Sequence, residues 1–250
     1  MDLHEKVCLV TGGTSGIGAA TALSLARKGA HIAIASRNIP DAMPACLHEA
    51  VKAQHRRIKH FQFEAGSASE CRGCVESVVE EFGHIDVLVH SAGGAVPGGL
   101  FTVTDQNWMD AFAVHVHAVL HLVKTAAPHI ARRGEGAVML ISSAAGLRGC
   151  LGALAYGVVK GALPQFARIL ARELADQRIR VNCVSPGIIR TPFQDFLSPE
   201  QATRNINDRI PLHREGTPED VAAVITALIE NDFITGENLV IDGGMTMRIV

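Results

Sequence analysis

The sequence predicts a doubly wound parallel α/β fold in a single domain, with helices on both faces of the sheet. Short β-branched runs alternate about six times with longer stretches of helical period, an order that is typical of a parallel sheet of about seven strands. With 250 residues, the chain is long enough for a sizeable core and too short for two enzyme-sized domains. Apolar residues make up 48% and charged residues 19%, which excludes a disordered chain. We therefore expect one domain over residues 1–250.

Each strand is predicted from a short apolar run bounded by turn residues, and each helix from a 3.6-residue period with glycine or proline near its ends. The predicted strands are Val7–Val10, His31–Ala35, Ile58–Phe63, Val87–His90, Ala137–Ser142, Arg180–Val184 and Leu239–Ile241. The predicted helices are Ile17–Arg27, Pro40–His55, Ser69–Phe82, Asp105–Arg132, Ala153–Leu174 and Pro218–Glu230. Pro164 predicts a kink or a lost hydrogen bond inside its helix. The polar, proline-containing segment Thr191–Pro211 predicts a mobile lid over the substrate.

The charge balance excludes several classes of partner. A formal charge of −2 and a pI near 6.6 leave no basic surface for nucleic acid or for an anionic membrane. The apolar runs fall far short of the roughly 20 residues that cross a bilayer, and Met1–Lys6 does not resemble the start of a signal peptide. We therefore expect a cytoplasmic protein. Its six cysteines are too sparse for a disulfide scaffold and are predicted to be reduced core residues.

A glycine-rich turn, Thr11–Gly18, follows the first strand and opens the first helix. Glycines let the backbone turn tightly and approach a pyrophosphate, whose charge is stabilised by the N-terminal end of the helix. Because the turn lies between a buried strand and an amphipathic helix, it indicates a Rossmann-type dinucleotide site rather than an ordinary turn. The cofactor-binding residues expected here are Gly12, Thr14, Ser15, Gly16, Ile17 and Gly18.

The end of the second strand indicates which dinucleotide binds. An acidic residue there would hydrogen-bond a free ribose 2′-hydroxyl, but this chain has Ser36, Arg37 and Asn38. A guanidinium can bind a 2′-phosphate that a carboxylate would repel. The sequence therefore favours NADP(H), with NAD(H) as the alternative cofactor and a solvated arginine as the structural alternative.

A third group combines Ser143, at the end of a strand, with Tyr156 and Lys160 on the following helix. Tyrosine and lysine at i and i+4 share one helix face, so the ammonium is expected to lower the pKa of the phenol. A hydroxyl at a strand end can hold a substrate oxygen while charge develops on it. A lone Tyr-x3-Lys pair is usually just an exposed helical pair; its coincidence with the glycine-rich turn favours a proton-transfer site.

Taken together, these motifs resemble the short-chain dehydrogenase/reductase family, and the resemblance covers essentially the whole chain. It includes the glycine-rich turn, the Ser143, Tyr156 and Lys160 set, and the His90–Gly93 segment where the family has Asn-Asn-Ala-Gly. It implies hydride transfer between a nicotinamide and a carbonyl or secondary alcohol, with Tyr156 as general acid and base. It also implies a homotetramer, or a homodimer, built on the two long helices and the C-terminal segment. The further cofactor-binding residues that it implies are Glu64, Ala65, Ser91, Ala92, Gly93, Tyr156, Lys160, Pro186, Gly187, Ile189 and Thr191.

Besides His90 and Ser91, two further positions depart from the family pattern. His115 stands where the family has an asparagine in a proton relay, and a histidine can also relay protons. Glu64 stands where the family has an aspartate near the adenine. His117 and His121 share a helix face, but no further ligand completes a set, so no metal site is expected.

The substrate is predicted only as a class. Three segments are expected to shape its pocket, Ala95–Phe101, Leu147–Leu154 and residues 193–210. Their apolar residues favour a hydrophobic carbonyl compound; these are Leu100, Phe101, Leu147, Leu151, Phe193, Phe196 and Leu197. The alternative reaction is reduction of a 3-oxoacyl thioester of acyl-carrier protein or CoA, for which Arg190, Arg204 and Arg209 would form the docking surface. A second alternative, of another class, is a regulator that binds NADP(H) without turnover.

Overall fold

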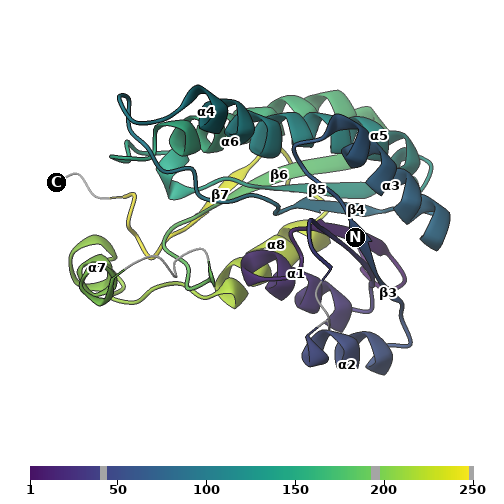
Figure 1. Ribbon diagram of the computed structural model, residues 1–250. Coiled ribbons are helices and arrows are strands. Elements are labelled where there is room, and N and C mark those ends of the chain that lie inside the picture. The colour runs from purple at the N-terminus through teal and green to yellow at the C-terminus, as the bar shows by residue number, and fades with distance from the viewer. Residues whose placement is uncertain (40–43, 193–197, 248–250) are drawn as a thin grey trace.

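The computed structural model contains one parallel sheet between two layers of helices (Figure 1). It describes residues 1–39, 44–192 and 198–247. The strand order is β3-β2-β1-β4-β5-β6-β7, and every neighbouring pair is parallel. The strands are β1 (Val7–Thr11), β2 (His31–Ser36), β3 (Ile58–Gln62), β4 (Val87–His90), β5 (Gly136–Ile141), β6 (Ile179–Pro186) and β7 (Asn238–Ile241). The predicted doubly wound sheet is confirmed. Because the order reverses between β1 and β4, their carboxyl ends flank the crevice where such folds bind ligands.

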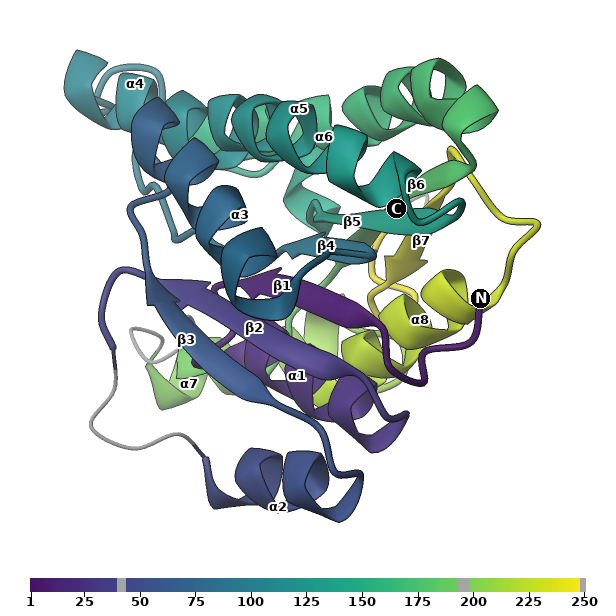
Figure 2. The ribbon, with the colours of Figure 1, turned by 90° about the vertical axis from the view of Figure 1, so that its right-hand side faces the viewer.

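Helices cover both faces of the sheet (Figure 2). α1 (Gly16–Arg27), α2 (Ala45–Ala53) and α8 (Pro218–Glu230) pack on one face, and α3 (Ala68–Phe82), α5 (Ala118–Ala131) and α6 (Leu154–Leu174) on the other. Each strand places alternate side chains on the two faces of the sheet, so the sheet separates two hydrophobic cores. Both cores consist largely of aliphatic residues. No helix among the described residues is long and apolar enough to span a bilayer.

The prediction that all six cysteines are core residues is wrong for two of them. Cys8, Cys71, Cys74 and Cys183 are buried, whereas Cys46 and Cys150 are exposed. Cys46 lies next to Leu47 on the short helix α2. Only one face of this helix, with Leu47 and Val51, is buried, and Cys46 is on the other face. Cys150 lies in the loop after β5, where it borders a cleft.

The helix predicted over Asp105–Arg132 is interrupted. It consists of α4 (Asp105–Phe112), a π-helical turn at Ala113–His117, and α5. A π-turn adds a residue to one turn and displaces the regular carbonyl partners. The Val114 carbonyl here accepts a hydrogen bond from the Nε2 of His90, at 3.2 Å. The 3.6-residue period gave no sign of this turn, because His90 supplies its stabilising contact from a strand.

Two other segments also differ from the predictions. α2 begins at Ala45 rather than near Pro40, because Pro44 is in an extended conformation as the residue before the helix; Pro40 itself lies outside the described residues. The predicted lid contains a capped helix, α7 (Pro199–Arg204), followed by a π-turn at Asn205–Arg209. Figure 1 shows α7 standing apart from the helical layers, on the side of the molecule where the C-terminus lies.

Candidate functional site

A cleft of about 1810 Å³ opens at the carboxyl ends of the strands. Every predicted catalytic and cofactor-binding residue lines this cleft except Gly18. Gly18 lies behind the glycine-rich turn, where a Cβ would be 2.2 Å from the Gly12 carbonyl oxygen. Its absence of a side chain therefore allows the helix to start close to the turn, which is a structural requirement and not a contact with a ligand.

The start of α1 is suited to a phosphate group. Ser15, the residue before the helix, makes no side-chain cap hydrogen bond, and the first turn contains no acidic residue. The first N–H groups of α1 are therefore without a carboxylate or hydroxyl cap at the point where Thr14, Ser15 and Gly16 line the cleft. Gly12 adds a close approach, because a Cβ on it would lie 2.8 Å from the Ala92 nitrogen. The turn thus fits a dinucleotide pyrophosphate.

Ser36, Arg37 and Asn38 line the cleft beyond β2. The Arg37 side chain is largely exposed, with its Nε 4.0 Å from the Glu64 carboxylate. A weak, solvated pair of this kind leaves the guanidinium available to another anion. Glu64 also accepts a hydrogen bond from the Gly66 N–H, at 3.2 Å, so its carboxylate is tied partly to its own loop.

Sequence reasoning missed His60, which supports this end of the cleft from β3. The Ser36 hydroxyl donates to the Asn38 carbonyl at 2.8 Å and contacts the His60 Nε2 at 2.7 Å. Because the hydroxyl has one proton, the imidazole must be the donor in the second bond. Burial lowers the pKa of His60, in agreement with this neutral form.

Ser143, Tyr156 and Lys160 meet at the floor of the cleft. Ser143 follows β5, and the other two lie in the first turns of α6. Ser143 hydrogen-bonds the Tyr156 phenol. The Lys160 Nζ lies 5.6 Å from the centre of the Tyr156 ring and donates to the Ile141 carbonyl at 2.8 Å. The predicted constellation is therefore assembled by the packing of α6 on β5.

The expected lowering of the Tyr156 pKa by Lys160 is wrong for this structure. Burial raises the pKa of Tyr156, and the hydrogen bond with Ser143 opposes this shift. Lys160 is itself buried, which lowers the pKa of its ammonium to about 8. One of its N–H groups donates to the Ile141 carbonyl.

The backbone around Lys160 confirms that Pro164 removes a helical hydrogen bond. Proline has no N–H to donate to the carbonyl four residues earlier, which belongs to Lys160. α6 nevertheless continues from Leu154 to Leu174. The Ser142 hydroxyl donates to the Lys160 carbonyl, at 2.7 Å. Sequence analysis did not single out Ser142, although the Pro164 spacing indicated that the Lys160 carbonyl needed a donor.

Two buried histidines lie near this site: His115 lines the cleft beside Tyr156, and His90 lies at the end of β4. His90 is bonded through Nδ1 to the Thr11 hydroxyl, at 2.9 Å, and through Nε2 to the π-turn. His115 is buried, donates from Nε2 to the Gly94 carbonyl at 3.2 Å, and meets the Tyr156 ring edge-on at 6.0 Å between centres. Burial and the nearby Lys160 lower the pKa of His90 to about 4 and that of His115 to about 2.

The outer wall of the cleft is more polar than predicted. Leu151 lines it, but Leu100 and Phe101 are 71% and 95% exposed and do not, so the prediction is wrong for these two residues; Leu147 does not line it either. Phe193, Phe196 and Leu197 lie outside the described residues. The polar side chains of the wall are Asn107, Asp110, Arg148, Gln201, Arg204, Asn205, Asp208 and Arg209.

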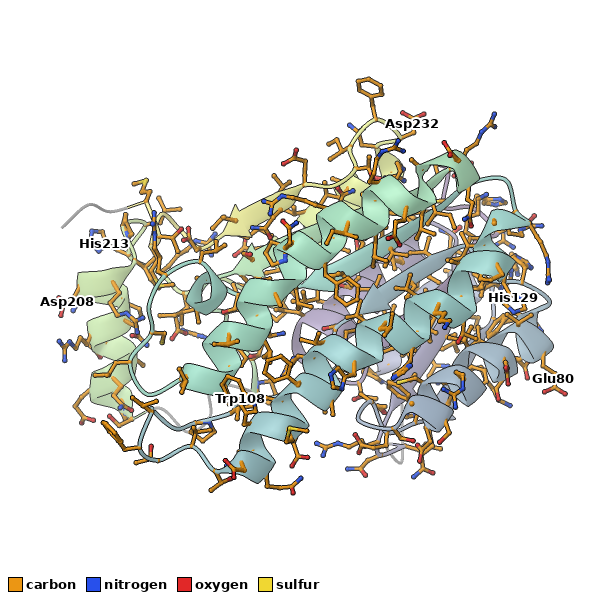
Figure 3. The ribbon with its side chains drawn as sticks, turned by 90° about the horizontal axis from the view of Figure 1, so that it is seen from above. Glu80, Trp108, His129, Asp208, His213 and Asp232 are labelled. Atoms are coloured by element: carbon orange, nitrogen blue, oxygen red, sulfur yellow. The ribbon has the colours of Figure 1, made fainter. Side chains whose placement is uncertain are left out.

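The three arginines predicted as a docking surface for an acyl-carrier protein are only partly free. Arg190 is paired with Glu215 at 3.1 Å, Arg204 lies 3.8 Å from Asp208, and Arg209 bonds the Asn205 side chain at 2.9 Å. Figure 3 shows Asp208 on this segment, at the end of the molecule away from His129. Over residues 1–39, 44–192 and 198–247, no three His, Cys, Asp or Glu side chains are grouped to hold a metal ion.

Comparison with known proteins places these features in one family. Residues 12–246 match the family model described as enoyl-(acyl carrier protein) reductase. The chain is 34% identical to the 3-oxoacyl-[acyl-carrier-protein] reductase FabG of Thermotoga maritima, over 99% of this chain and 100% of the relative. It is also 34% identical to human dehydrogenase/reductase SDR family member 4, over 99% and 90% of the two chains.

Solved structures agree. L-sorbose reductase from Gluconobacter frateurii, in complex with NADPH and L-sorbose, superimposes with a TM-score of 0.88 at 28% identity, over 100% of both chains. A short-chain dehydrogenase/reductase from Serratia marcescens gives a TM-score of 0.90 at 28% identity, over 98% of this chain and 100% of that one. The chain belongs to the short-chain dehydrogenase/reductase family of oxidoreductases.

Proposed function

We propose that this protein is an NADP(H)-dependent oxidoreductase that transfers a hydride between the nicotinamide and a carbonyl compound or secondary alcohol. The observation that carries the proposal is the meeting of Ser143, Tyr156 and Lys160 at the floor of a cleft whose other end is the glycine-rich turn. The solved relative in complex with NADPH and a ketose supports the same chemistry.

The side chains divide the work of proton transfer. Bound NADPH supplies the hydride. Ser143 holds the substrate oxygen, and Tyr156 donates its proton to that oxygen as charge develops. Lys160 holds the nicotinamide ribose and stabilises the phenolate that remains. With a pKa of about 2, His115 stays neutral near pH 7, so we assign it to the proton path as a hydrogen-bonding group that does not itself store a proton.

Replacement of Tyr156 tests this assignment. Tyr156→Phe keeps the ring that packs against His115 and removes only the proton donor. NADPH binding should persist, measured by nucleotide fluorescence, while turnover falls about 10²- to 10⁴-fold. Carbonyl reduction at the wild-type rate by the purified variant would refute the proposed function.

The cofactor preference rests on Arg37, for which Arg37→Gln is the matching variant. A guanidinium binds a 2′-phosphate, so kcat/KM with NADPH should fall about 10-fold or more while kcat/KM with NADH changes little. Equal losses with both nucleotides would favour a structural role for Arg37 and leave NAD(H) as the cofactor.

The second candidate reaction is reduction of a 3-oxoacyl thioester, which the Thermotoga maritima relative favours. Turnover of a 3-oxoacyl thioester, a simple ketone and a ketose should be compared to separate the two reactions. The ketose is included because the outer wall of the cleft is polar. Tight NADPH binding without turnover of any of these substrates would favour the regulator instead.

We also propose a homotetramer or homodimer. Leu120 on α5 and Val158 and Ile169 on α6 are partly exposed apolar residues, as are Leu239 and Val240 on β7. Surfaces of this kind are typical of subunit contacts. Sedimentation of the purified protein should give a mass at least twice that of one chain.

A further inference from the structure

Three consecutive residues at the end of β5, Ile141 to Ser143, hold the first turns of α6. The Ile141 carbonyl accepts from the Lys160 Nζ at 2.8 Å, the Ser142 hydroxyl donates to the Lys160 carbonyl at 2.7 Å, and Ser143 bonds the Tyr156 phenol. The first and third contacts involve groups already placed in the proposed mechanism. Ser142 is 2% exposed and makes a contact that the mechanism does not yet use.

Pro164 explains why this contact exists. In an uninterrupted α-helix, the N–H of residue 164 would bond the carbonyl of Lys160, but proline has no N–H. A buried carbonyl without a donor is costly. The serine hydroxyl replaces the missing donor, so the bond that normally lies inside the helix comes here from the residue that follows β5.

We propose that Ser142 is a positioning residue, which fixes the main chain of Lys160 against β5 so that its ammonium and the Tyr156 phenol keep their relative places. The proposal rests on the proposed function, because it concerns the same proton-transfer site. Ser142 acts through Lys160, whose carbonyl its hydroxyl holds, and not on the reacting atoms. Its importance depends on Pro164.

Ser142→Ala leaves the Lys160 carbonyl without its donor. We expect kcat to fall about 5- to 30-fold, the change produced by losing one buried hydrogen bond, with the KM of the carbonyl substrate within about twofold of wild type. The phenolate is then less well stabilised, so the pH profile for alcohol oxidation should move to higher pH. Ser142→Thr keeps a hydroxyl and should retain most of the activity.

Pro164→Ala supplies the matched rescue, because alanine restores the N–H that the Lys160 carbonyl needs. Alone it should leave kcat within about twofold of wild type, and in the Ser142→Ala, Pro164→Ala double variant kcat should return to within about threefold. Ser24→Ala is the control, since it deletes a serine hydroxyl bonded to Thr226 between α1 and α8. It should lower the melting temperature without moving the pH profile.

The outcomes separate this inference from the proposed function. Wild-type kcat and pH profile in Ser142→Ala, or a loss that Pro164→Ala does not rescue, would overturn the role of Ser142 even if Tyr156→Phe is inactive. If Ser142→Ala does not fold, Pro164→Ala should restore folding, and failure to do so would also overturn it. If the protein reduces no carbonyl, the hydrogen bond from Ser142 to the Lys160 carbonyl can still be tested by stability. The effects of Ser142→Ala and Pro164→Ala on the free energy of unfolding should then not be additive.

Discussion

Tyr156 is the single tyrosine of the chain, and its environment has opposing effects on its ionisation. The sequence correctly predicts that Tyr156 and Lys160 lie on one helix. It does not reveal that Lys160 is buried and donates to Ile141, or that burial raises the pKa of the phenol. Periodicity gives the side of a helix on which a residue lies, but the pKa depends on the strand that covers that side.

A titration of phenol absorbance in the free protein therefore reports Tyr156 alone. We expect an apparent pKa above the ordinary value of about 10, because burial disfavours the phenolate. Ser143→Ala should raise it further, since the Ser143 hydrogen bond lowers it. A free-protein pKa well below 10 would show that Lys160 dominates after all.

Lys160 should reduce the stability of the fold near neutral pH. Its pKa is about 8 in the folded chain and 10.5 in the reference state, so burial of the ammonium costs about 3 kcal/mol below pH 8. Between pH 8 and 10.5 Lys160 holds more of its proton in the unfolded chain than in the folded one, so the cost of burying it falls as pH rises; the buried cysteines, whose pKa values are raised, act in the opposite direction in both proteins. Lys160→Met should be inactive, more stable than wild type at pH 7, and its advantage in stability over wild type should shrink as pH rises to 10. Denaturant unfolding at pH 7, 8 and 10 measures the difference.

At the scale of elements, the sequence was most accurate where hydrophobic period and end signals agreed. α8 was predicted at its observed limits because Thr217 and Asp220 form a capping box and Pro218 is the first residue of the helix. The π-turn before α5 was missed because it depends on His90, a residue of a different element. Such turns are determined by tertiary contacts, which a local pattern does not contain.

The other end of α8 depends on Arg180 of β6. Its guanidinium donates to the Leu228 carbonyl at 2.6 Å and to the Ile229 carbonyl at 2.5 Å. These carbonyls end the helix, where a cation is also favoured by the helix dipole. Arg180→Met should lower the free energy of unfolding by about 2–3 kcal/mol without changing the KM for NADPH. Arg172→Met, at the end of α6, is the control and should change stability little. Equal effects would contradict a capping role.

At the scale of the molecule, nearly all of the catalytic and cofactor-binding residues predicted from the sequence do line the cleft, because parallel strands bring their carboxyl ends to one edge. It did not predict the supports behind that edge. His60, Ser142 and His90 each act through a contact between two elements far apart in sequence or on different layers. The outer wall was also mispredicted, since apolar residues in a loop can point away from the cleft.

The buried histidines His90 and His115 make the stability of the fold sensitive to acid. His90 has a pKa of about 4 and His115 of about 2, against 6.5 in the reference state. The folded chain keeps both neutral while the unfolded chain binds two protons, so the stability present above pH 6.5 is lost as pH falls toward 4. Each histidine contributes about 1.4 kcal/mol per pH unit in this window.

Urea unfolding between pH 6.5 and 4.5 should therefore show a decline of up to about 3 kcal/mol per pH unit at the acid end. A His90→Asn, His115→Asn double variant keeps side chains that can hydrogen-bond but do not titrate. It should have lower stability at pH 7 and a much shallower decline with acid. Because the slope, and not the level, reports the two protons, a double variant with the wild-type slope would show that other groups cause the acid sensitivity.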